Sequence, residues 1–182
     1  MKISNFKFQI RDIALPSIIV VIAVLMRLLP HLPNFTPIAA MALFGGCYLD
    51  KKYAIAIPLL AMFVSDIFLG FHNTMIFVYG SFLLTGFLGM WLRRKKSVSS
   101  VAGAAILSSI GFFIITNFGV WAVTELYPKT LNGLIESYYF ALPFFRNTVI
   151  GDLLYTGVFF GGYEAIKDIR ILRYKDIKRE VS

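Results

Sequence analysis

Charged side chains are scarce in this sequence. Asp, Glu, Lys and Arg make up 15% of the 182 residues, whereas soluble domains carry about 25%. Hydrophobic residues make up 58%, and the mean hydropathy is +0.73. These values nearly exclude a soluble single domain. Because a membrane-crossing helix needs about 20 apolar residues, a chain of 182 residues has room for about six such helices with short connections.

The sequence also lacks most of the residue patterns that support enzyme or metal chemistry. Its single cysteine, Cys47, excludes an intrachain disulfide, and the Cys–His spacing of a structural zinc site is missing. The motifs G-x4-G-K-[ST], H-E-x-x-H and G-x-S-x-G are absent too. We therefore predict no metal, no cofactor and no enzymatic activity. One alternative is an intramembrane enzyme that uses Asp66 and Asp152 as an acid–base pair. The residues before Asp152, however, depart from the Gly-x-Gly-Asp pattern of intramembrane aspartyl proteases.

Six apolar segments predict an all-α membrane protein with six transmembrane helices in one bundle. The predicted spans lie at about residues 13–29, 34–49, 53–71, 75–92, 98–123 and 143–166. Lys2, Lys7 and Arg11 precede the first segment as in a signal peptide, but no small-x-small cleavage site follows, so we predict a retained span. Residues 131–142 have an apolar helical face and are too short and polar to cross, which predicts an interfacial helix before the last span. A lid over an outward-facing pocket is the alternative.

The net charge of +8 follows the predicted topology. All but three of the 18 Lys and Arg residues lie in the N-terminal segment, in the connections at 50–52 and 93–96, and in the basic tail at 167–182. This positive-inside pattern predicts a multi-pass protein of the bacterial cell (inner) membrane, with both termini cytoplasmic. The basic residues are therefore expected to contact anionic lipids, and nucleic acid is not an expected partner.

Polar residues within the predicted spans gather toward the outer ends. Such residues are costly in a membrane and commonly mark a functional site. A one-sided cluster suits a ligand site that is open to the outside, with stacking and a few directed hydrogen bonds. The predicted ligand-binding residues are Asn34, Asp66, His72, Asn73, Asn117, Trp121, Arg146, Asn147 and Asp152. Trp121 would stack on the ligand, and Arg146 would meet an anionic group or hold Asp152. The alternative is that the aspartates pair with Arg27 or Arg146 and only hold helices together.

Small residues at helical spacing predict close helix packing. They form two stripes, Ser81-x3-Thr85-x3-Gly89 and Gly157-x3-Gly161. We predict that both stripes pack inside this bundle. The alternative is that they receive a separate membrane subunit.

Three stretches carry a resemblance to known proteins. They are NFTPIAAMALFGG at 34–46, PLLAMFVSDIFLGFH at 58–72, and TNFGVW at 116–121 together with PFFRN at 143–147. Over the second to sixth spans, the chain resembles a family of small bacterial membrane proteins that is grouped with the substrate-binding S components of energy-coupling factor (ECF) transporters.

The resemblance implies a substrate-binding membrane subunit for uptake of a small micronutrient such as a vitamin. S components are six-helix proteins that bind their substrate at the outer face and work with an ECF-type coupling membrane protein and ATPases. Some relatives, such as solitary cobalamin transporters, are proposed to work alone. The chain departs from the pattern twice: Ala14 is followed by Ile18 and not by the Ala-x3-Ala docking motif, and Cys47 lies at the wrong depth for a cobalt ligand. A membrane scaffold without a small ligand is the remaining alternative.

Overall fold

The structure of the chain is a computed structural model. It describes residues 18, 21–22, 25–29, 32–51 and 53–180, with side chains as far as Ile169. All regular secondary structure in these residues is helical. The labelled helices are α2 (Ile38–Tyr48), α3 (Ala56–Leu69), α4 (Met75–Leu92), α5 (Val98–Val123) and α6 (Leu131–Glu180). Most of the first predicted span, 13–29, lies outside the described residues, although residues 25–28 are helical.

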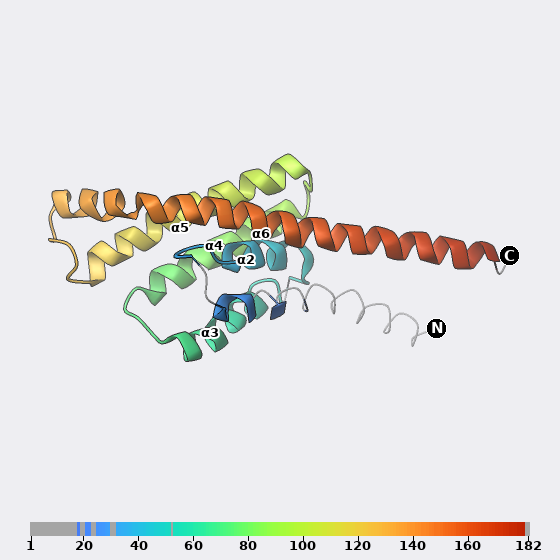
Figure 1. Ribbon diagram of the computed structural model, residues 1–182, viewed down its shortest axis with the longest axis horizontal. Coiled ribbons are helices and arrows are strands. Elements are labelled where there is room, and N and C mark those ends of the chain that lie inside the picture. Colours follow the sequence, from blue (N-terminus) through green and yellow to red (C-terminus); the bar gives the residue numbers. More distant parts are fainter. Residues whose placement is uncertain (1–17, 19–20, 23–24, 30–31, 52, 181–182) are drawn as a thin grey trace.

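Successive helices run in opposite directions and pack into one bundle (Figure 1). In the α5–α6 pair, Ser109 contacts Asp152, and Phe113 contacts Phe145 with ring centroids 4.7 Å apart. The α3–α4 and α5–α6 connections therefore lie at one end, which we call the His72 end. The α2–α3 and α4–α5 connections lie at the other, which we call the Arg93 end.

Helix α2 is apolar on all sides and forms the centre of the bundle. Every residue from Ile38 to Cys47 is buried, because α2 packs against the other four labelled helices. An apolar helix without a polar face is expected in such a place. Helix α2 thus gives the bundle its core, to which Phe44 contributes a ring that is completely buried.

Close packing between α2 and α4 depends on glycine. A Cβ atom added to Gly46 would collide with the carbonyl oxygen of Gly86, and one added to Gly89 would collide with that of Leu43. Ser81 and Thr85 are 3% exposed and lie on the same helix face as Gly89. The predicted packing of the Ser81–Thr85–Gly89 stripe inside the bundle is therefore confirmed.

Basic side chains gather at the Arg93 end. The Arg93 guanidinium donates hydrogen bonds to the carbonyl oxygens of Gly46, at 2.7 Å, and Leu49. These carbonyls belong to the last turn of α2, where backbone acceptors lack partners within the helix. The Lys96 ammonium lies 4.2 Å from the ring centroid of Tyr48, also at the end of α2. Arg93 and Lys96 thus place positive charge at the C-terminal end of α2, where the helix dipole favours it.

The largest departure from the predicted elements is α6. We predicted a short interfacial helix at 131–142 and a separate span from 143, but the structure has one continuous helix of 50 residues that includes Pro143. The reason lies in its buried face, which continues unbroken past the proline and packs on α5. This face comprises Ser137, Ala141, Thr148, Asp152 and Thr156. Pro143 itself is exposed, so its ring does not interrupt the contact.

Two of the described helices, α4 and α5, are long and apolar enough to cross a membrane. They have the bounds that we predicted, 75–92 and 98–123. Helices α2 and α3 are apolar but shorter than the predicted segments 34–49 and 53–71. With 11 residues, α2 is only about 16 Å long, against about 30 Å for the hydrocarbon core of a bilayer. The described helices therefore differ greatly in the thickness of membrane that each could cross.

Candidate ligand-binding site

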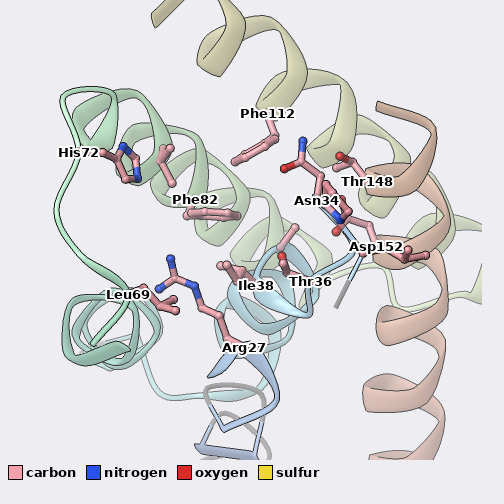
Figure 2. Close-up of a pocket in the computed structure, with 14 residues that line it drawn as sticks. Arg27, Asn34, Thr36, Ile38, Leu69, His72, Phe82, Phe112, Thr148 and Asp152 are labelled. Carbon is pink, nitrogen blue, oxygen red and sulfur yellow. The ribbon is translucent and has the colours of Figure 1, made fainter. Parts of the chain in front are cut away.

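A cavity of about 320 Å³ lies between the helices toward the His72 end (Figure 2). The segment before α2 and all five labelled helices, or the turns next to them, contribute to its wall. The lining residues are Arg27, Leu32, Pro33, Asn34, Thr36, Ile38, Ala39, Leu69, His72, Val78, Phe82, Phe112, Thr148 and Asp152. Mixed apolar walls with a few polar groups are typical of small-molecule sites, and the volume is at the lower end of their range.

One wall contains a buried ion pair. The Arg27 guanidinium lies 2.5 Å from Asp66 Oδ1, and the Tyr79 hydroxyl donates to Asp66 Oδ2 at 2.6 Å. Arg27 also donates to the Met62 carbonyl oxygen at 3.2 Å and to the Ser65 hydroxyl. Both carboxylate oxygens of Asp66 are thus occupied. Asp66 was predicted to line the site, but it does not line the cavity. Instead, it joins α3 to α4 and holds the Arg27 guanidinium, which lines the cavity.

The opposite wall contains the second buried aspartate. Asp152 is 3% exposed and accepts one hydrogen bond, 2.6 Å long, from the Ser109 hydroxyl. Thr148 lies one helical turn earlier on α6 and also lines the cavity. In Figure 2, Asp152, Thr148 and Asn34 lie on one side, and Arg27 and His72 lie on the other. The cavity therefore has two different polar walls.

The segment between residues 32 and 36 closes the cavity beside α6. Asn34 lines it with a φ of 60°, a left-handed conformation that asparagine adopts more readily than most residues. The Asn147 amide donates to the Pro33 carbonyl oxygen at 3.1 Å. Asn147 therefore does not line the cavity, and instead fastens the segment that does.

His72 lies in the turn after α3 and lines the cavity, as predicted. Its Nδ1 lies 2.8 Å from the Thr74 hydroxyl, and this hydrogen bond links two residues of the same turn. Asn73, between them, is exposed and does not line the cavity.

Three other predicted residues lie away from the cavity. The Asn117 amide donates to the Phe113 carbonyl oxygen at 2.7 Å, within its own helix. The Trp121 indole donates to the Pro128 carbonyl oxygen at 3.0 Å, so Trp121 fastens the α5–α6 connection. Arg146 is exposed and makes no contact with Asp152. The sequence predicted the correct end of the bundle for these residues, but not which way their helix faces point. The position of a residue along a helix does not define how the helix is rotated about its axis.

Most of the lining residues were not predicted from the sequence, among them Phe82, Phe112 and Thr148. Phe82 and Phe112 form an aromatic pair with ring centroids 5.3 Å apart. The sequence contains 18 phenylalanines and no signal that separates these two from the rest. Thr148 was detectable, since it lies four residues before Asp152 and therefore on the same helix face.

A second cavity, of about 510 Å³, lies at the Arg93 end between the start of α5 and α6. Its wall is mostly apolar and includes Gly157 and Gly161. Both glycines are exposed, and an added Cβ at either would meet nothing within 4 Å. The prediction that this stripe packs inside the bundle is therefore wrong for the residues described. The buried Thr156 hydroxyl also lines this cavity and has no hydrogen-bond partner in the described part of the chain.

These features define an all-helical protein with two helices able to cross a membrane and a mixed polar cavity at one end of its bundle. The chain belongs to a family of unknown function, DUF6580, whose model matches residues 7–174. Neither a curated protein nor a solved structure matches the chain.

Proposed function

We propose that this protein is a multi-pass membrane protein of the bacterial cell membrane that binds a small micronutrient for uptake, in the manner of an S component. The observation that carries the proposal is the cavity at the His72 end, to which every labelled helix contributes. The apolar helix α2 contributes Ile38 and Ala39 to its wall, and the polar groups among its lining residues are few. This arrangement favours enclosure of a small polar molecule over a pore, which needs polar groups along its whole depth.

The surface of the bundle supports a membrane location. Large apolar side chains are exposed on several helices, and Phe68, Ile76 and Val98 are 75%, 75% and 89% exposed. Soluble proteins rarely leave so many large apolar side chains in water. Basic side chains at the Arg93 end favour a cytoplasmic position for that end, which turns the cavity toward the outside.

The intramembrane enzyme is the weaker alternative. An acid–base pair needs two carboxyl groups that can each exchange a proton with the substrate. Asp66 has both oxygens bonded, to Arg27 and Tyr79, and it does not line the cavity. Only Asp152 of the two aspartates lines the cavity.

The decisive experiment identifies small molecules that the protein retains. The full chain is purified in mild detergent, and its bound small molecules are released and measured by mass spectrometry. Thr148→Phe, which fills the cavity, should reduce the retained molecule at least about tenfold, because one bulky ring occupies the volume that a ligand needs. Ile150→Phe is the matched control, since Ile150 is on the same helix but 48% exposed.

Equal retention in both variants would show that the ligand binds elsewhere. A folded protein that retains no small molecule but always purifies with the same protein partner would support the scaffold alternative. Co-purification of a coupling membrane protein and ATPases together with the ligand would support an ECF-type assembly, whereas uptake by the chain alone would support a solitary transporter.

A further inference from the structure

The charges around the cavity do not balance on the Asp152 side. Asp152 is almost fully buried, and its single hydrogen-bond donor among the described residues is the neutral Ser109 hydroxyl. The described cation that lines the cavity, Arg27, is in direct contact with Asp66. A buried carboxylate with one neutral donor is costly unless another group compensates its charge.

Asp152 can accept further hydrogen bonds from within the cavity. A carboxylate has about four acceptor positions, and one of them is occupied by Ser109. The neighbouring polar groups, Thr148 and Asn34, are neutral. A ligand that brings two N–H donors and a positive charge would therefore satisfy Asp152, as an arginine does in a bidentate pair.

The aromatic pair adds a second reason for a cationic ligand. Phe82 and Phe112 line the same cavity, and their rings are tilted by 35° to each other. Aromatic faces attract cations, and the attraction grows where water is excluded. Flat, apolar walls next to a carboxylate suit a planar organic cation better than a hydrated metal ion.

We propose that the cavity selects a small organic cation, such as an amine, an amidinium or a charged nitrogen heterocycle, and that Asp152 recognises its positive charge. The inference rests on the proposed function, because it assigns the class of ligand to the same cavity. Arg27 and Asp66 are a self-contained pair in this arrangement and contribute shape to the site and no net charge.

The test uses three probes of nearly equal shape and different charge: benzamidine, benzamide and benzoate. Binding of each to the full chain in detergent, at pH 8 and in potassium buffer, is measured by ligand-observed NMR titration. Benzamidine is expected to bind at least about tenfold more tightly than benzamide, and benzoate more weakly still. Asp152→Asn should reduce benzamidine binding to the level of benzamide. Asp168→Asn, an exposed aspartate on the same helix, is the matched control and should retain the preference.

The outcomes separate the inference from the proposed function. If the three probes bind equally, or if benzoate binds best, and Thr148→Phe still blocks them, the cavity binds ligands but the cation preference is overturned. If no probe binds to folded wild-type protein, the inference is overturned, whereas the proposed function is contradicted only if the purified protein also retains no small molecule. Competition between sodium and benzamidine would assign the position beside Asp152 to an inorganic cation and would also overturn the inference. The probe preference of the wild-type protein tests the sign of the charge even if Asp152→Asn fails to fold.

Discussion

Two buried aspartates with the same exposure have different surroundings. Asp66 has a cation and a phenol within hydrogen-bond distance, whereas Asp152 has one serine hydroxyl. Burial alone therefore does not assign a role to a carboxylate within a helical bundle. The neighbours decide whether it holds helices together or is available to a ligand.

At the residue scale, Asp66→Asn should destabilise the bundle. The substitution leaves the Arg27 guanidinium buried without its counter-charge, and breaking such a pair costs about 3 kcal/mol or more. Thermal unfolding of the purified protein should show a clearly lower Tm. Asp50→Asn, which changes an exposed aspartate, is the control and should leave the Tm unchanged.

A double variant separates the effect of the lost ion pair from the effect of the altered side-chain volumes. Arg27→Met combined with Asp66→Asn removes both charges and should be less destabilised than the sum of the two single variants. Additive losses would indicate that the two side chains do not interact, contrary to the 2.5 Å contact.

The sequence predicted part of the candidate site at this scale. Asn34, His72 and Asp152 line the cavity as expected, and pairing of Asp66 with Arg27 was the stated alternative. Trp121 was expected to stack on a ligand and instead bonds the α5–α6 connection. The role of Trp121 depends on how α5 is rotated and on the Pro128 carbonyl oxygen seven residues later. Neither can be predicted from the polarity of a residue and its position along the helix.

At the scale of elements, the two small-residue stripes have opposite surroundings. The Ser81–Thr85–Gly89 stripe faces α2 at backbone contact, whereas Gly157 and Gly161 have open space beside them. The spacing is the same in both, so the sequence signal could not distinguish them. The difference comes from which helix packs beside each stripe.

Gly89→Ala and Gly161→Ala should therefore have opposite effects. A methyl group at Gly89 meets the backbone of α2, which cannot yield without moving the helix, and should cost about 1–3 kcal/mol of stability. The same change at Gly161 meets open space and should be neutral or stabilise α6, because alanine is the better helix former. Parallel measurements of Tm check the pair, and equal losses in both would contradict the described packing.

Element boundaries followed the strength of their sequence signals. Helices α4 and α5 have the predicted limits because basic, polar or glycine-containing turns flank long apolar runs. Helix α6 was divided incorrectly at Pro143, because residues 131–142 are too short and too polar to cross a membrane and were therefore assigned to a separate interfacial helix. What continues it is a face of small and polar residues against α5, a tertiary contact that local propensity does not contain.

At the scale of the whole molecule, the bundle has two chemically different ends. The His72 end has the cavity with its mixed polar walls, and the Arg93 end has the basic connections. Asymmetry of this kind is expected of a protein held in one orientation by the charge difference across a membrane.

Labelling of single cysteines in intact cells tests the proposed orientation, in which the His72 end faces outside and the Arg93 end faces the cytoplasm. The native Cys47 is 4% exposed and should remain silent toward a membrane-impermeant maleimide. Asn132→Cys, at the exposed start of α6, should react from outside. Ser99→Cys, at the exposed start of α5, should react only after the cells are permeabilised. The reverse pattern would contradict the proposed outward position of the cavity.

The continuity of α6 has a mechanical consequence. At 1.5 Å per residue, its 50 residues extend over about 75 Å, and Glu180 lies roughly 42 Å beyond Asp152. Because the helix is unbroken, a tilt at its cavity end would be carried to its far end. A tilt of about 10° at Asp152 would displace the far end by about 7 Å, more than one helical turn. Under the proposed function, a small adjustment around a bound molecule would thereby become a large movement of the distant charged segment.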